Sequence, residues 1–207
     1  MIIRNIWGIG RNYSKHAQEL SNPVPEAPIV FLKAGSCASV NSPEIRLPWW
    51  LGEVHHEVEL AVKIGNNYQI IEGAVALDLT ERALQNKAKK EGLPWTPAKS
   101  FPNACIVSSF FTLKNWETVK DARISLWVND ELRQSAILDE MIFKLPELVR
   151  HVVDFYPVCP GDLILTGTPA GVGPLQAGDH LKAQIEGHIT HLWKVSKDAA
   201  PPNEANT

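Results

Sequence analysis

The amino-acid sequence predicts an α+β fold in which strands outnumber helices. Fifteen prolines and thirteen glycines divide the 207 residues into many short apolar runs, a pattern typical of strands joined by turns. Segments with helical spacing are few and do not alternate regularly with the expected strands, which disfavours a doubly wound α/β sheet. We therefore expect a β-rich body with a few short helices.

The expected strands are short apolar or alternating runs, at 28–33, 57–64, 73–78, 104–111, 123–129, 162–166 and 180–186. The clearest is "EVELAVKI" (57–64), in which Glu57 and Glu59 share one face and Val58 and Leu60 share the other. Such alternation is typical of a half-buried strand. Taken alone, it favours an edge strand with its acidic face in water. The alternative is a pair of carboxylates held together by a cation.

Three segments have helical signals. "TERALQNKAKKEGLPW" (80–95) contains good helix formers and stops at Gly92 and Pro94. "KLPELVRHVVDFY" (144–156) places leucines and valines at helical spacing. We also expect a short helix at 13–20.

Length, charge and cysteine content restrict the class of protein. We expect one domain over 1–197 and a frayed tail over 198–207, because "DAAPPNEANT" has no periodicity. A net charge of −3 and a pI near 6.2 indicate no nucleic-acid partner, and no apolar run approaches the roughly 20 residues of a membrane span. Three distant cysteines and no signal-peptide pattern predict a cytoplasmic protein without disulfides or zinc.

A third carboxylate follows the expected strand 73–78. Asp78 precedes the helix that begins near Thr80, and "DLTE" resembles a capping box, so a helix cap is the favoured interpretation. A strand-end aspartate beside Glu57 and Glu59 would instead make an all-oxygen site for a hard cation such as Mg²⁺, Mn²⁺ or Ca²⁺.

The segment "CPGDLILTGTPAGVGPLQAGDHL" (159–181) is rich in glycine but matches neither a phosphate-binding P-loop nor a dinucleotide fingerprint. After the expected strand it presents backbone N–H groups and the hydroxyls of Thr166 and Thr168. Such a loop can hold a small carboxylate.

Eight segments, in order between about Gly8 and Val195, carry a family resemblance: "GRNYSKHAQEL", "FLKAGSC", "HHEVELAV", "VALDLTERALQ", "GLPWTPAKSF", "VNDELRQS", "DEMIF" and "PGDLILTGTPAGVGP". Together they resemble the fumarylacetoacetate hydrolase superfamily, in its short single-domain branch of acylpyruvases and oxaloacetate decarboxylases. The resemblance implies a mixed β-roll or sandwich with a few short helices, and a homodimer.

The resemblance also implies a metal site. It makes Glu57, Glu59 and Asp78 the ligands of one divalent ion, Mg²⁺ with Mn²⁺ or Ca²⁺ as substitutes. This replaces the edge-strand and helix-cap interpretations.

Further roles follow from the same resemblance. His16 and Glu19 match a helical pair on a mobile lid that activates water, and Lys99 matches a residue placed to neutralise a carboxylate or enolate. The residues that match substrate contacts are Arg11, Arg82, Gln85 and Thr168.

The implied function is cleavage of a carbon–carbon bond in a small 2-oxo acid through a metal-stabilised pyruvate enolate. It covers hydrolysis of acylpyruvates or fumarylpyruvate and decarboxylation of oxaloacetate. The alternatives are an isomerase/decarboxylase of aromatic-acid catabolism and a catalytically silent protein that binds metal and keto acid. Two features depart from the family pattern: the connection at 65–74 is short, and Ala83 stands where an acidic residue is frequent.

Overall fold

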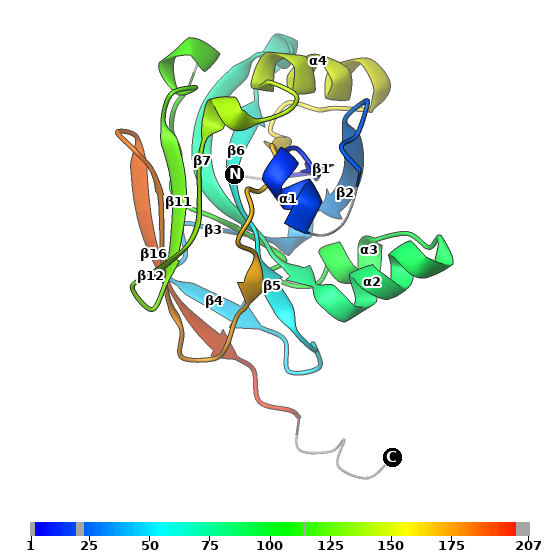
Figure 1. Ribbon diagram of the computed structural model, residues 1–207, viewed down its shortest axis with the longest axis vertical. Coiled ribbons are helices and arrows are strands. Elements are labelled where there is room, and N and C mark those ends of the chain that lie inside the picture. Colours follow the sequence, from blue (N-terminus) through cyan, green and yellow to red (C-terminus); the bar gives the residue numbers. More distant parts are fainter. Residues whose placement is uncertain (1–2, 20–22, 114, 202–207) are drawn as a thin grey trace.

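The computed structural model describes residues 3–19, 23–113 and 115–201, and Figure 1 shows their arrangement. The described chain forms curled sheets with short helices at their margins. The strand-rich α+β fold expected from the sequence is confirmed. Of the expected tail, residues 202–207 lie outside the described part.

The largest sheet has the strand order β2-β1-β13-β6-β7-β9-β3, and β10 also pairs with β7. Its strands are β1 (Asn5–Gly10), β2 (Ile29–Ala34), β3 (Ala38–Val40), β6 (Val58–Ile64), β7 (Ile70–Asp78), β9 (Cys105–Val107), β10 (Phe111–Thr112) and β13 (Leu163–Leu165). β6 lies between β13 and β7, and only Lys63 along it is not fully buried. The edge-strand interpretation is therefore wrong, because strands cover both edges of β6 and packing covers both faces.

A second sheet has the order β12-β11-β15-β16-β4, and a small third sheet has the order β14-β5-β8. These strands are β4 (Glu44–Leu47), β5 (Val54–His56), β8 (Thr80–Glu81), β11 (Arg123–Val128), β12 (Glu131–Ile137), β14 (Gly173–Pro174), β15 (His180–Ile185) and β16 (Ile189–Lys197). β11 packs on β6 and β16 packs on β7. The apolar core lies between these layers, around side chains such as Leu60, Leu126 and Trp193.

The helices are α1 (Ser14–Glu19), α2 (Arg82–Glu91), α3 (Thr96–Lys99) and α4 (Leu145–Phe155). α2 starts where the Glu81 carboxylate accepts the N–H of Leu84, and it ends at Gly92 with a left-handed φ of 67°. Figure 1 shows α4 over one end of the sheets, α2 beside α3 at another margin, and α1 between them. Among the described helices, none is long and apolar enough to cross a membrane.

The short connection between β6 and β7 is a tight hairpin. Ile64 pairs with Ile70, and the Gly65 N–H donates to the carbonyl of Gln69 at 2.8 Å. Asn67 adopts a left-handed φ of 57° in this turn, a conformation that asparagine tolerates better than most residues. The hairpin register brings the far end of β7 beside the start of β6, which is where the acidic residues lie.

Candidate active site

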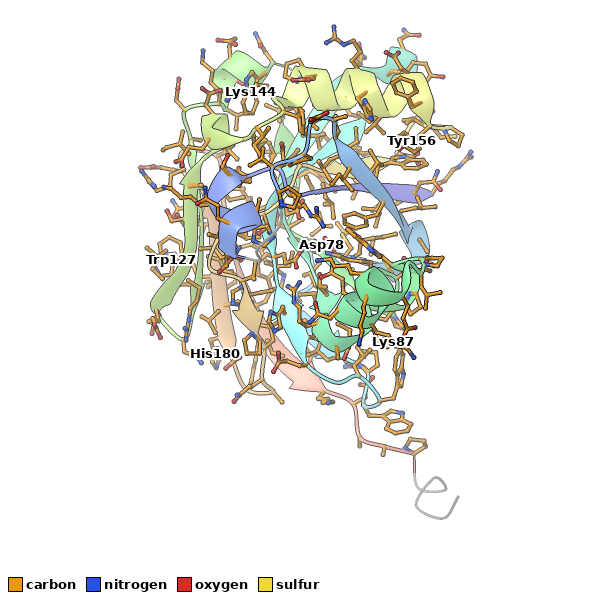
Figure 2. All side chains as sticks on the ribbon, turned by 45° about the vertical axis from the view of Figure 1, so that its right-hand side comes forward. Asp78, Lys87, Trp127, Lys144, Tyr156 and His180 are labelled. Carbon is orange, nitrogen blue, oxygen red and sulfur yellow. The ribbon has the colours of Figure 1, made fainter. Side chains whose placement is uncertain are left out.

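Three buried carboxylates converge where β5 passes into β6 and β7 ends. Glu57 stands between β5 and β6, Glu59 lies on β6, and Asp78 is the last residue of β7. The Asp78 N–H donates to the Glu57 carbonyl at 2.8 Å, which holds these two residues side by side. One oxygen from each carboxylate lies within 4.8 Å of the others, and the residues are 5%, 1% and 1% exposed. Figure 2 shows Asp78 near the middle of the molecule.

The helix-cap interpretation of Asp78 is wrong. Glu81, three residues later, caps α2, whereas the Asp78 carboxylate accepts from two buried lysines. Lys99, from α3, lies 2.5 Å from Asp78 Oδ2 and 2.9 Å from Glu57 Oε2. Lys33, from β2, contacts Asp78 Oδ1 and donates to the Leu79 carbonyl at 3.1 Å. The lysines compensate a carboxylate that would otherwise be expensive to bury.

Arg82 and Gln85 reach the site from the first turn of α2. Arg82 Nη2 donates to Glu57 Oε1 at 2.7 Å, and Nη1 donates to Gln85 Oε1 at 2.6 Å. Burial opposes ionisation of Glu57, but the Lys99 and Arg82 cations hold its pKa well below the usual range. Ala83 is exposed, so the departure from the family pattern at this position lies outside the pocket.

Glu59 has different hydrogen-bond partners from Glu57 and Asp78. Among the described residues its side chain accepts one hydrogen bond, from the Gly167 N–H at 2.6 Å, and no cation pairs with it. Burial, and then the nearby Asp78 charge, raise the pKa of Glu59 well above its usual value. Glu59 therefore has no cationic partner of its own in the described part of the chain, although it is buried beside two other carboxylates. The three carboxylates together form a set of oxygen donors that fits a hard divalent ion.

His16 lies on the inner side of α1 and is 5% exposed. Its Nδ1 is 3.0 Å from Glu19 Oε2, and Glu19 Oε1 accepts the Gly171 N–H at 3.0 Å. The carboxylate therefore orients the imidazole and links α1 to the glycine-rich loop. Thr168 also faces the pocket, but its hydroxyl donates to the Val58 carbonyl at 2.9 Å. A substrate carboxylate could use this hydroxyl donor only by displacing that bond.

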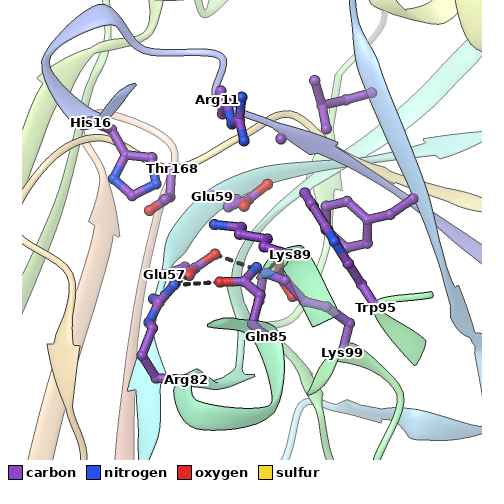
Figure 3. A pocket seen from close by; sticks show the side chains of 14 residues that line it. Arg11, His16, Glu57, Glu59, Arg82, Gln85, Lys89, Trp95, Lys99 and Thr168 are labelled. Atoms are coloured by element: carbon purple, nitrogen blue, oxygen red, sulfur yellow. Dashed lines mark hydrogen bonds and ion pairs between the residues drawn. The ribbon is translucent and has the colours of Figure 1, made fainter. Parts of the chain in front are cut away.

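These side chains line one small cavity, shown in Figure 3. The residues singled out from the sequence border it, with two exceptions. Glu19 stands behind His16, and the Thr166 hydroxyl instead donates to the Leu60 carbonyl at 3.0 Å. The cavity volume is about 30 Å³, room for about two water molecules.

The sequence analysis missed six residues at this cavity, among them Ile9 and Gly10 of β1. Lys33 binds Asp78 from behind, and Phe31, Lys89 and Trp95 line the wall. Lys89 had a readable signal, because Arg82, Gln85 and Lys89 are spaced at three and four residues and so share one face of α2. For Phe31 and Lys33 the signal was their place in the family segment "FLKAGSC", because taken alone their strand reads as an ordinary apolar run.

Comparisons with known proteins show which proteins this chain is similar to. The family described as fumarylacetoacetate (FAA) hydrolase C-terminal matches residues 5–194. The mitochondrial oxaloacetate tautomerase FAHD1 of Mus musculus is 38% identical over 204 residues, covering 94% of this chain and 92% of that protein. The oxaloacetate tautomerase YcgM of Escherichia coli is 40% identical over 191 residues, covering 87% of each. The crystal structure of fumarylpyruvate hydrolase from Pseudomonas aeruginosa in complex with Mn²⁺ and pyruvate has a TM-score of 0.88 and 30% identity, covering 95% of this chain and 91% of that one.

Proposed function

The chain belongs to the fumarylacetoacetate hydrolase family, in its short single-domain branch, and from this premise we propose that it forms the enolate of a small 2-oxo acid with a divalent metal ion. The observation that carries the proposal is the cluster of three buried carboxylates, of which Glu59 has no cation. The complex of the Pseudomonas relative with Mn²⁺ and pyruvate supports it.

Glu57, Glu59 and Asp78 would hold the ion, with Mg²⁺ as the proposed metal and Mn²⁺ or Ca²⁺ as substitutes. When bound, a divalent cation polarises the 2-oxo carbonyl and stabilises negative charge that develops on its oxygen. Lys99 and Arg82 keep Glu57 ionised, and Lys33 and Lys99 pair with Asp78. The protein's own cations thus keep Glu57 deprotonated.

His16 is the proposed base. Its imidazole faces the cavity and is oriented by Glu19, so it can take a proton from the substrate's C3 or from an attacking water. Returning the C3 proton to oxygen or carbon interconverts the keto and enol forms, as the names of the mouse and Escherichia coli relatives state for oxaloacetate. Water attack on a distal carbonyl breaks the carbon–carbon bond of an acylpyruvate, and loss of carbon dioxide breaks that of oxaloacetate. All three reactions pass through the same kind of enolate.

Two other functions are open to the same pocket. An isomerase/decarboxylase of aromatic-acid catabolism would use the same metal and enolate chemistry on a longer substrate. A catalytically silent protein would bind metal and keto acid without turnover. The ordered His16–Glu19 pair beside the carboxylates favours an enzyme. The homodimer and the cytoplasmic location also stay predictions, and the name of the mouse relative places that protein in mitochondria.

The deciding experiment measures keto–enol interconversion of oxaloacetate, and pyruvate release from oxaloacetate, acetylpyruvate and fumarylpyruvate. Each is assayed with Mg²⁺, with Mn²⁺ and after chelation. We expect turnover that chelation abolishes and metal restores, and we expect Asp78→Ala to be inactive and less stable, because buried Lys33 loses its carboxylate. Activity that survives exhaustive chelation, or full activity in Asp78→Ala, would refute the proposal.

Replacing His16 distinguishes the reactions by their need for a base. Hydrolysis and tautomerisation move a proton, whereas decarboxylation only releases carbon dioxide from a bound substrate. His16→Ala should lower acylpyruvate hydrolysis by something like 10²–10⁴, the usual contribution of a positioned base, and lower decarboxylation much less. If steady-state assays show equal losses of hydrolysis and decarboxylation, His16 contributes to substrate binding or to closure of α1 and is not the base.

A further inference from the structure

Two cationic side chains at the cavity lack an acidic partner. Arg11 follows β1 with a left-handed φ of 60°, and its Nε is buried without a hydrogen-bond partner. Lys89, half-buried on α2, lies with its Nζ 5.5 Å from the centre of the Trp95 ring. Within the described ranges, neither side chain forms an ion pair with a carboxylate, although both line the cavity. Figure 3 shows them entering from different elements.

The charges around the cavity are unequal. Five cationic side chains surround three carboxylates: Arg11, Lys33, Arg82, Lys89 and Lys99. Lys33, Arg82 and Lys99 already pair with Glu57 or Asp78. Burial, and then the Arg11 charge, lower the pKa of Lys89 to about 8, which indicates that these two cations lie close enough to repel each other. A divalent ion on the carboxylates would increase the positive excess further, so the unpaired cations favour an anion.

We propose that Arg11 and Lys89 bind the distal carboxylate of a dicarboxylic 2-oxo acid, whose 2-oxo acid end faces Glu57, Glu59 and Asp78. The inference rests on the proposed function, and it narrows the substrate class from 2-oxo acids in general to those with a carboxylate at each end. Acylpyruvates without a distal carboxylate, such as acetylpyruvate, would leave both cations unpaired. A buried charge without its partner is costly, so such substrates bind more weakly.

Binding the distal carboxylate also selects among reactions. Decarboxylation of oxaloacetate breaks the bond between C3 and C4, leaves the electron pair in the enolate and releases C4 as neutral carbon dioxide. The carboxylate must lose the charge that Arg11 and Lys89 stabilise, so their contacts oppose this step. Tautomerisation moves only the C3 proton and keeps both carboxylates. The pair therefore favours tautomerisation over decarboxylation.

Oxaloacetate and its C4 methyl ester provide matched probes, because the ester replaces the distal negative charge with a methyl group. Binding is measured by calorimetry with Mg²⁺ present, and tautomerisation and carbon dioxide release are followed separately. In Lys89→Met we expect the affinity for oxaloacetate to fall about 10–100-fold, the usual range for losing a charged hydrogen bond. The affinity for the ester should stay unchanged, and carbon dioxide released per tautomerisation event should rise. Lys89→Arg should retain the preference for oxaloacetate.

Lys90→Met is the matched control, since Lys90 is the next residue of α2 and is exposed. It should leave binding of both probes unchanged. Equal effects of Lys89→Met on oxaloacetate and its ester, or no effect on either, would overturn the inference. If the wild-type protein turns over neither probe, the proposed function fails. The calorimetric comparison still decides whether Arg11 and Lys89 bind a distal carboxylate.

Discussion

At the scale of single residues, the three clustered carboxylates have different surroundings, although they lie within reach of one metal position. Glu57 and Asp78 receive lysine and arginine donors, whereas Glu59 receives a backbone N–H. Glu59 is thus the carboxylate of the three that has no cationic partner among the described residues. Burying the Glu59 carboxylate without a cationic partner lowers the stability of the metal-free protein. For the same reason, a bound metal ion gains a strong ligand in Glu59.

Glu59→Gln should therefore stabilise the chelated protein while removing its response to metal. The amide oxygen can still accept the Gly167 N–H, but no negative charge is buried beside Asp78. We expect the variant to be more stable than the wild type in chelator at neutral pH, because the raised pKa of Glu59 means that folding opposes its ionisation and the amide does not ionise. Urea unfolding with chelator and with Mg²⁺ measures both effects. A variant that is less stable in chelator yet still stabilised by Mg²⁺ would contradict this interpretation.

We expect the affinity for a dicarboxylate to depend on pH, because the Lys89 ammonium loses its proton within the accessible pH range. Arg11, Arg82 and Lys99 lower its pKa, Glu57 raises it, and burial contributes most to the value of about 8. Below this pH the ammonium is present in the free protein. Above it, binding a carboxylate requires proton uptake, so the affinity for oxaloacetate should fall by up to roughly tenfold per pH unit. Calorimetry between pH 7 and 9.5 should show this fall for oxaloacetate and not for its methyl ester. If the affinities for oxaloacetate and its ester fall in parallel, a group other than Lys89 is responsible for the pH dependence.

At the scale of elements, β1 and β2 together form the aromatic wall of the cavity. Gly8 pairs with Phe31 across the two antiparallel strands, and the Phe31 ring lies over the glycine. A Cβ at Gly8 would lie closer than 3.0 Å to three atoms of the Phe31 ring. The missing side chain thus allows Phe31 to lie flat on β1 and meet Trp95, with 5.7 Å between the ring centroids.

Gly8→Ala should push the Phe31 ring into the cavity. We expect a destabilisation of about 1–3 kcal/mol, as for other overpacked sites, together with weaker substrate binding. Gly10→Ala on the same strand is the control for stability only, since Gly10 lines the cavity and its Cβ would find its nearest neighbours at an ordinary 3.7 Å. Urea unfolding and the KM for oxaloacetate measure the two effects. Similar losses of stability in the two variants would exclude the Phe31 contact as the cause.

At the scale of the whole molecule, the sheets gather cavity residues that lie far apart in the chain. Arg11 follows β1, Glu59 lies on β6, and Thr168 follows β13, which pairs with both β1 and β6. The parallel pairing of β1 with β13 places the ends of both strands at one edge, so the α1 segment and the glycine-rich loop meet over the carboxylates.

The assembly expected from the family resemblance is a homodimer. One chain has a mass of 23.0 kDa, so sedimentation equilibrium should give twice this mass at micromolar concentration. Dilution with and without Mg²⁺ shows whether the pocket and the association are coupled. A single-chain mass at every concentration would contradict the dimer prediction.

The sequence by itself determined the β-rich class, the helices near 82–91 and 145–155, and the carboxylates that meet at the site. These follow from local periodicity and capping, and from motifs whose family resemblance the comparisons confirm. The strand β1 was missed because "NIWGIG" contains two glycines and reads as a turn. Expected strand 104–111 ends at Val107, and pairing resumes only at β10.

Only the tertiary structure decided whether the acidic residues face water or lie buried. Alternation in "EVELAVKI" cannot show that β13 and β7 cover both edges of β6. The burial of Asp78 depends on Lys33 and Lys99, which are 45 and 21 residues away along the chain. The pairing of Arg11 with Lys89 also depends on the tertiary structure, because the two residues come from different elements. Only the fold shows that both face the same cavity and that, within the described ranges, neither has a carboxylate partner. Local sequence patterns specify which groups a segment presents, and long-range packing decides which charges are left unpaired.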